Sequence, residues 1–98
     1  MTKKHFVLKL IPSRPTFAQD MTPEEKSIMQ QHVAYWRDLM DKGKVLAFGP
    51  VIDPKGVYGL GIVEVDDEEE VTVFTTNDPA AKINSYEVYP MMAVTPKK

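Results

Sequence analysis

Hydrophobic and polar positions alternate in four short stretches of the chain, where β-branched and aromatic residues are also common. This pattern is typical of strands that bury one face. It predicts strands at residues 4–11, 44–52, 57–65 and 86–94. The turn-forming sequence Asp53-Pro54-Lys55-Gly56 joins the second and third stretches, which predicts a hairpin. Gly49-Pro50 interrupts the second stretch, and because proline cannot donate to a sheet ladder we expect a strand edge, a bulge or a bend there.

A long helix is predicted between the first two strands. Thr22 can cap it, Pro23 suits its first position, and Glu25 lies where a capping box needs an acid. The helix should run to about residue 41 or 42, because Gly43 is the kind of residue that ends helices in the left-handed conformation. Residues 12–22, before this helix, contain two prolines and are predicted to form a long loop.

One face of the long helix is almost entirely apolar. At about 100° per residue, a continuous stripe forms. Its members are Ile28, Met29, His32, Val33, Trp36, Leu39 and Met40. An ionisable imidazole therefore lies inside an apolar stripe and should point inward. Asp38 and Asp41 fall on the opposite side of the helix, so they are poor partners for it.

A second helix is predicted at about residues 67–76, after the acidic run at 66–70. The run could bind cations, but a helix cap followed by acids in the first turn is the better interpretation. The sequence VTVFTT within the helix has strand propensity, whereas the start signal and the spacing of Val71 and Phe74 favour a helix. Asn77-Asp78-Pro79 should end it, because the residue before a proline is pushed out of helical conformation.

The predicted order is strand, helix, strand, strand, helix, strand. It indicates an α+β fold of the ferredoxin-like βαββαβ type, with a four-stranded antiparallel sheet and two helices on one face. We expect one domain over residues 1–98, with residues 94–98 as a frayed tail. The exposed sheet face of so small a domain would bury a second copy well, so a homodimer in the form of a dimeric α/β barrel is expected.

Composition narrows the function classes. The chain is 43% hydrophobic and 27% charged, as ordinary globular proteins are, and its net charge of −2 offers no basic surface for nucleic acid or membranes. Cysteine is absent, which excludes disulfides and thiolate chemistry, and two separated histidines predict no metal site. We find no secretory signal, spanning segment or nucleotide motif, so we expect a cytoplasmic protein that needs no cofactor.

The pattern His32-x3-Trp36-x2-Leu39-x3-Gly43-x-Val45-Leu46-x2-Gly49-Pro50, followed by Asn77-Asp78-Pro79, resembles the YCII-related domain family. The resemblance runs from the first strand to residues 86–90. It implies a dimeric ferredoxin-like barrel with a pocket beside the sheet and a histidine–aspartate pair, here His32 and Asp78. One branch of the family is similar to dehydrochlorinases of aromatic degradation, and muconolactone isomerases share its fold.

The inward imidazole of His32 agrees with that role, because imidazole exchanges protons near neutral pH and a carboxylate on its other nitrogen would fix its tautomer. The alternative is a core histidine that hydrogen-bonds a backbone carbonyl or packs at a dimer interface. Arg14, on the long loop, is either an anion contact or a solvated arginine. Six further residues are candidates for an apolar pocket, although core packing is the commoner role of each aromatic one: Phe17, Trp36, Phe48 and Tyr58 as aromatic walls, with Gly49 and Pro50 shaping the sheet beside them.

We therefore predict a small enzyme of the lyase or isomerase type, in which His32 acts as acid and base and Asp78 orients it. Its substrate would be a small organic molecule, aromatic or lactone-like. Two alternatives stay open: a non-catalytic dimer that binds a small molecule in the same pocket, and a purely structural module.

Overall fold

The computed structural model describes residues 3–96. Its strands are β1 (Lys4–Ile11), β2 (Val45–Val51), β3 (Tyr58–Val65) and β4 (Ser85–Met91). Its helices are α1 (Phe17–Asp20), α2 (Pro23–Asp41), α3 (Glu68–Asn77) and the 3-10 helix η1 (Pro79–Lys82). If the short α1 and η1 are left aside, the predicted order of strand, helix, strand, strand, helix, strand is confirmed.

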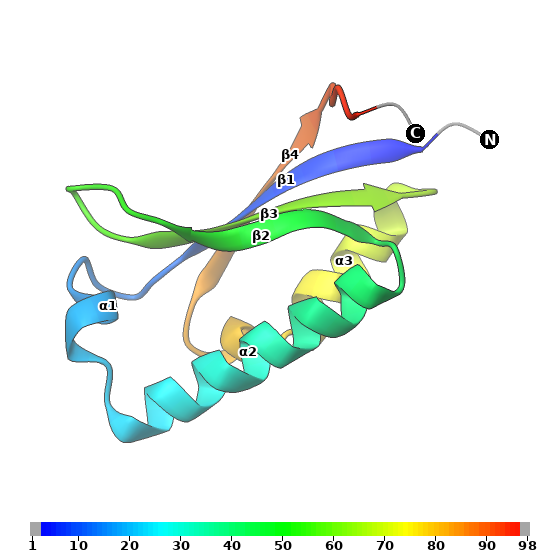
Figure 1. Ribbon diagram of the computed structural model, residues 1–98. Coiled ribbons are helices and arrows are strands. Elements are labelled where there is room, and N and C mark those ends of the chain that lie inside the picture. Colours follow the sequence, from blue (N-terminus) through cyan, green and yellow to red (C-terminus); the bar gives the residue numbers. More distant parts are fainter. Residues whose placement is uncertain (1–2, 97–98) are drawn as a thin grey trace.

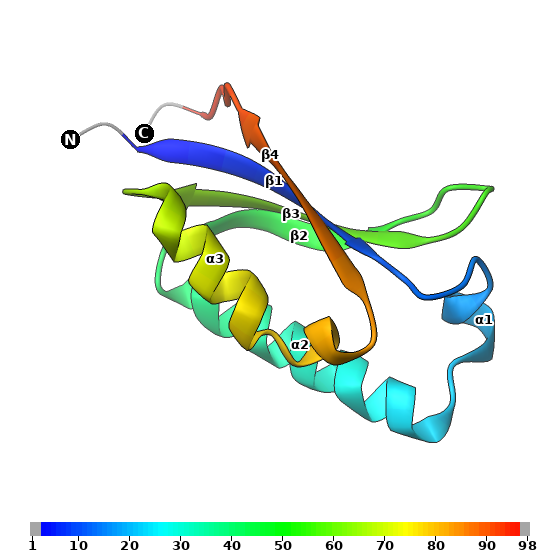
Figure 2. The same ribbon diagram turned by 180° about the vertical axis from the view of Figure 1, so that it is seen from behind.

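The four strands form one sheet in the order β2-β3-β1-β4, and each neighbouring pair is antiparallel. Helices α2 and α3 lie side by side beneath the same face of this sheet, and within residues 3–96 no helix covers the other face (Figures 1 and 2). The ferredoxin-like βαββαβ prediction is therefore confirmed.

Buried and half-buried residues alternate along the central strands β1 and β3, and the buried ones form the core. Phe6, Leu8 and Leu10 of β1 are buried beneath the helices, while the residues between them are only half-buried on the opposite face. Val63 and Val65 of β3 are fully buried in the same layer. From the helices, the residues that complete this core are Trp36, Leu39, Val71 and Phe74.

Helix α2 begins and ends at the residues that the sequence predicts. The Thr22 side chain accepts a hydrogen bond from the Glu25 N–H at 3.1 Å, and the Glu25 carboxylate accepts one from the Thr22 N–H at 2.9 Å. At the other end Gly43 has φ +80°, which a side chain would strain, and the Lys44 N–H donates to the Leu39 carbonyl at 3.0 Å. Both ends thus satisfy backbone groups that a helix leaves unpaired.

The acidic run also caps a helix, as predicted. The Asp67 side chain accepts from the Glu70 N–H at 3.3 Å, and Glu70 accepts from the Asp67 N–H at 3.2 Å, which forms a second capping box. Val71 and Phe74 are buried against the core, so burial outweighs the strand propensity of VTVFTT.

Three details of the prediction need correction. The stretch 12–22 is not wholly a loop, because Phe17, which is buried, anchors the single helical turn α1. Of the three alternatives at Gly49-Pro50, the strand edge is confirmed, because β2 lies at the edge of the sheet and continues through Pro50. The bulge is not there, since the irregularity in β2 falls between Val45 and Ala47. Strand β4 ends at Met91, and residues 92–96 have no regular structure. The rest of the predicted tail, residues 97–98, lies outside the described residues.

Candidate active site

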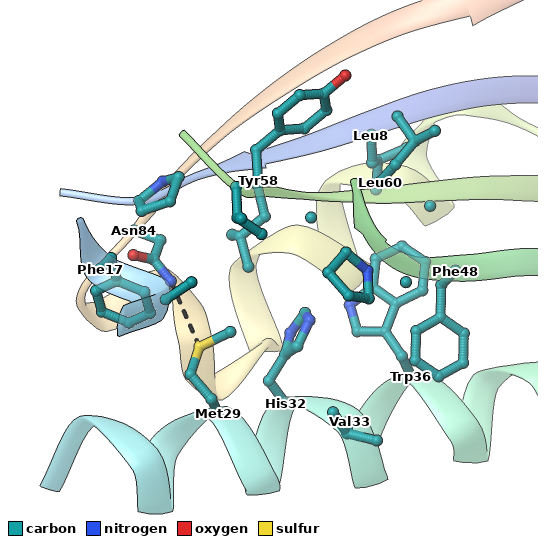
Figure 3. A pocket seen from close by; sticks show the side chains of 18 of the residues that line it. Leu8, Phe17, Met29, His32, Val33, Trp36, Phe48, Tyr58, Leu60 and Asn84 are labelled. Atoms are coloured by element: carbon teal, nitrogen blue, oxygen red, sulfur yellow. Dashed lines mark hydrogen bonds between the residues drawn. The ribbon is translucent and has the colours of Figure 1, made fainter. Parts of the chain in front are cut away.

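A cavity of about 230 Å³ lies between the sheet and α2. The wall on the sheet side comes from Leu8 and Leu10 of β1, from Phe48 of β2 and from β3, where Gly59 and Gly61 carry no side chain into the space. Phe17 of α1 borders one end (Figure 3), and Ala18 of the same helix also lines the cavity. The cavity is therefore apolar over most of its surface, as sites for small organic ligands are.

His32 reaches this cavity from α2 (Figure 3). Its Nδ1 lies 2.7 Å from Asp78 Oδ2 and 3.0 Å from Asp78 Oδ1. The His32 side chain is 12% exposed, whereas that of Asp78 is 0% exposed. Because a carboxylate only accepts hydrogen bonds, Nδ1 must carry the proton. The other ring nitrogen, Nε2, has no hydrogen-bond partner within residues 3–96 and is the atom that a bound molecule can meet.

Asp78 is the centre of the polar network. It stands between α3 and η1, where Pro79 holds its backbone extended and its Oδ1 accepts from the Ala80 N–H at 2.9 Å. Its Oδ2 accepts from Trp36 Nε1 at 3.0 Å and from the Tyr86 hydroxyl. Four donors from α2, η1 and β4 therefore converge on a single buried carboxylate.

These contacts decide the charge of Asp78. Burial alone would raise the pKa of its carboxyl, but hydrogen bonds from His32, Tyr86 and the Ala80 N–H outweigh burial and lower that pKa. Burial and the neighbouring carboxylate raise the pKa of Tyr86 well above its ordinary value, so Tyr86 stays a donor. The result is an ionised Asp78 that holds His32 in one orientation and one tautomer.

Trp36 links the network to the sheet. Besides Asp78, its Nε1 donates to the Tyr86 hydroxyl oxygen at 3.1 Å, and its ring is 5.9 Å from that of Phe48. The indole lies directly on β3, because a Cβ at Gly61 would come within 2.5 Å of Trp36 Cζ3. This side chain thus occupies the space that Gly61 leaves open on the strand.

Most of the predicted site residues lie together at the cavity, whereas the ring of Tyr58 and the side chain of Arg14 lie elsewhere. Those that line the cavity with His32 are Phe17, Trp36, Phe48, Gly49 and Pro50. The strand at Tyr58 also borders the cavity, but its ring points to the opposite sheet face, where Lys9 Nζ is 4.7 Å from the ring centroid. The prediction that this ring forms a pocket wall therefore needs correction.

Arg14 does not line the cavity. Its guanidinium donates to both carboxylate oxygens of Glu25, at 3.0 and 2.8 Å, and to Asp20 Oδ1 at 2.7 Å. The hydrogen bond from Arg14 is the main reason why the pKa of Glu25 falls to about 2. Of the two roles that the sequence left open, the anion contact in the pocket is not formed, and Arg14 instead ties α1 to the start of α2.

Sequence reasoning missed two residues of the site, Tyr86 and Asn84. Tyr86 begins the last predicted strand, and its pairing with Leu10 puts its face of that strand over the cavity. The separation of four residues between His32 and Trp36 was a further signal, because it places two donors on one helix face, within reach of the same acceptor. Nothing in the sequence pointed to Asn84.

Within residues 3–96 no group of three histidine or acidic side chains is arranged to hold a metal ion. None of the helices in this part of the chain combines the length and the apolar character that crossing a membrane requires.

The fold and the site together define a class: a ferredoxin-like α+β protein with a buried aspartate that orients a histidine at an apolar cavity. The model of the YCII-related domain matches residues 6–95, and the chain belongs to that family. No match was found among curated proteins.

Solved structures share the fold. An uncharacterized protein from Thermotoga maritima is similar with a TM-score of 0.60 at 8% identity, over 92% of this chain and 99% of its own. A protein of unknown function from Nitrosomonas europaea gives 0.50 at 14% identity, over 100% and 97%. The 5-chloro-2-hydroxyhydroquinone dehydrochlorinase TftG from Burkholderia phenoliruptrix, solved with 2,5-dihydroxybenzoquinone, gives 0.61 at 26% identity, over 86% of this chain and 90% of that one.

Proposed function

We propose that this protein is a cofactor-independent enzyme of the lyase or isomerase type, in which His32 moves a proton on a small ring compound held in the apolar cavity. The observation that carries the proposal is the Nδ1–Asp78 hydrogen bond of 2.7 Å, which in the neutral imidazole leaves Nε2 without a proton and free to accept one at the cavity. When Nε2 takes a proton from a bound molecule, the buried carboxylate stabilises the imidazolium, as in the histidine–aspartate part of a catalytic triad.

The size of the cavity supports a substrate of one ring. Its 230 Å³ exceeds the roughly 150 Å³ of an engineered cavity that binds benzene. It is smaller than the sites of about 300 Å³ and more that hold drug-sized ligands. The apolar lining would bury the faces of a flat ring, while His32 would meet a group at its edge.

The similarity to the dehydrochlorinase TftG supports a particular reaction class. Net loss of HCl from a hydroxylated, chlorinated ring takes two proton transfers: one hydroxyl proton leaves as the chlorine-bearing carbon gains a proton, and a second hydroxyl proton leaves as chloride departs from that carbon. A base at the edge of the ring, in a site with few water molecules, is suited to these steps. We therefore propose elimination or isomerisation on a hydroxylated ring as the reaction of His32.

The test is chloride release from 5-chloro-2-hydroxyhydroquinone, used as a probe substrate. We expect His32→Gln to lower the rate at least about a hundredfold, the usual contribution of general acid–base catalysis. Asp78→Asn should also lower it, because an amide can no longer fix the tautomer of His32. His5→Gln is the matched control, since His5 lies on the opposite sheet face beside Glu64 and should keep the rate.

Full chloride release by His32→Gln would contradict the proposal. Binding of hydroxylated rings to the wild-type protein without turnover would favour the alternative, a module that binds a small molecule without catalysis.

We also propose that the protein is a homodimer that pairs through its uncovered sheet face. In the described structure this face presents half-buried apolar residues of the two central strands, Val7 and Ile11 from β1 and Leu60 and Ile62 from β3. Lys9 lies between Val7 and Ile11 on this face, and apolar residues gathered around such a polar group on an uncovered sheet are suited to an interface between proteins. A second copy on this face would leave the cavity, which lies on the helix side, in place.

A further inference from the structure

The buried carboxylate of Asp78 carries more donors on one oxygen than on the other. Its Oδ1 accepts from the Ala80 N–H at 2.9 Å and lies 3.0 Å from His32 Nδ1. Its Oδ2 lies 2.7 Å from the same Nδ1, and it also accepts from Trp36 Nε1 at 3.0 Å and from the Tyr86 hydroxyl. An ionised carboxylate offers about two lone pairs on each oxygen. Three donors therefore compete for Oδ2.

Tyr86 is a strong competitor because its hydroxyl is itself polarised. The hydroxyl oxygen accepts from Trp36 Nε1 at 3.1 Å, while its proton is donated to Asp78. Hydrogen bonds linked in this way strengthen one another inside a protein. The Asp78 side chain is 0% exposed, so its charge is shared among these donors rather than with bulk water. Each bond that Tyr86 or Trp36 makes to Oδ2 thus weakens the attraction of that oxygen for His32.

The charge on Asp78 is the one that His32 meets directly. Within residues 3–96, no other side chain forms a hydrogen bond or an ion pair with His32. In this part of the chain the cavity is lined by no lysine, arginine, aspartate or glutamate, and the ring of Tyr58 points to the opposite sheet face. Tyr35, on the same helix as His32, donates its hydroxyl to the Phe74 carbonyl at 2.9 Å.

We infer that Tyr86 is a positioning residue: by sharing Oδ2 of Asp78, it limits how strongly the carboxylate stabilises the imidazolium of His32. The inference rests on the proposed function, in which Nε2 must give up the proton that it has taken. A histidine that has a buried carboxylate to itself holds that proton more firmly and returns it more slowly. With three other donors on it, Asp78 still fixes the tautomer of His32 but stabilises the imidazolium less.

Two roles of the Tyr86 hydroxyl predict opposite results when it is removed. If the hydroxyl shares the charge, Tyr86→Phe leaves more negative charge on Oδ2 for His32, and the imidazole titrates at higher pH. If the hydroxyl only keeps Asp78 in place, the loosened carboxylate stabilises the imidazolium less, and the imidazole titrates at lower pH. The direction of the change therefore separates charge sharing from a merely structural role.

The experiment is an NMR titration of the imidazole rings in the full chain, without substrate. We expect Tyr86→Phe to move the midpoint of His32 to higher pH by about half a pH unit, a roughly threefold rise in proton affinity. This is a small part of what a hydrogen bond to a charged group contributes. Trp36→Phe removes another donor from Oδ2 and should move the midpoint in the same direction.

Tyr35→Phe is the matched control. It removes a hydroxyl that donates to the Phe74 carbonyl and not to Asp78, so the midpoint of His32 should stay in place. His5 is the internal reference in every variant, because it lies on the opposite sheet face beside Glu64. Its own midpoint should not move.

A His32 midpoint that stays in place or falls in Tyr86→Phe would overturn the inference, and so would an equal rise in Tyr35→Phe. If Tyr86→Phe does not fold, Trp36→Phe decides by the same criterion. A raised midpoint together with a wild-type protein that releases no chloride would support the role of Tyr86 and contradict the proposed reaction. Chloride release by the wild type with an unmoved midpoint in Tyr86→Phe would contradict the role of Tyr86 alone.

Discussion

At the scale of single residues, the missing side chain at Gly61 matters as much as the side chains of the site. Trp36 reaches Asp78 with its indole packed closely against β3, where Gly61 leaves room. The indole is 2% exposed and is held by hydrogen bonds at its nitrogen, so it cannot move aside without breaking them. A glycine in the sheet thus positions one of the four donors on the buried carboxylate.

Gly61→Ala should therefore destabilise the protein by about 1–3 kcal/mol, the usual cost of overpacking a core. It should also weaken ligand binding, because the displaced indole lines the cavity. Gly49→Ala is the matched control: it is a strand glycine with no atom within 4 Å of the added Cβ, and we expect a change of less than about 0.5 kcal/mol. Chemical denaturation measures both, and equal stabilities of the two variants would contradict this role of Gly61.

The residues of the site were predictable to different degrees. His32 was evident because helical periodicity places it in an apolar stripe. Its bond to Asp78 joins residues 46 positions apart, and periodicity carries no information on such a distance; the family resemblance supplied the pair. Asn84 and the role of Tyr86 depend on how η1 delivers the chain into β4, and a short 3-10 turn has no strong sequence signal.

At the scale of elements, the sequence predicts a helix correctly where residues typical of helix starts and helix ends stand at both of its ends. Helix α2 has a capping box at Thr22 and a left-handed glycine at Gly43, and both were read correctly. Helix α3 has only a start signal and a sequence of strand propensity, yet burial of Val71 and Phe74 decides its structure. Four residues of α1 were missed because one buried aromatic, Phe17, is too little to form a periodic pattern.

The elements also explain why Arg14 lies outside the site. Its position on a long loop suggested function, since loops often carry binding residues. The acids that neutralise it come from α1 and from the first turn of α2, and their approach to the loop is a tertiary contact. The guanidinium forms a bidentate hydrogen bond with Glu25, which holds the first turn of α2 in place beside the cavity.

At the scale of the whole molecule, the two faces of the sheet have separate tasks. The helix face holds the core and the cavity, and the uncovered face is the proposed interface with a second copy. Ile62 lies near the middle of that face, paired with Val7 on one side and Ala47 on the other. A charge there would remain unpaired if the face were buried against a partner.

Ile62→Lys should therefore convert a dimer into a monomer in sedimentation experiments, with the fold retained by circular dichroism. Val73→Lys is the matched control, because Val73 is an exposed apolar residue on α3, away from the open sheet face. A wild-type protein that sediments as a monomer, or an Ile62→Lys variant that stays dimeric, would contradict the proposed interface.

The central claim is that Asp78 holds the proton of His32 on Nδ1 and so presents an unprotonated Nε2 to the cavity. Long-range proton–nitrogen NMR correlation of the imidazole rings measures this directly in the neutral form. The account predicts the Nδ1–H tautomer for His32 and, as an internal contrast, the Nε2–H tautomer for His5, whose Nε2 lies 2.9 Å from Glu64 Oε2. A proton on Nε2 of His32, with Nδ1 unprotonated, would contradict it.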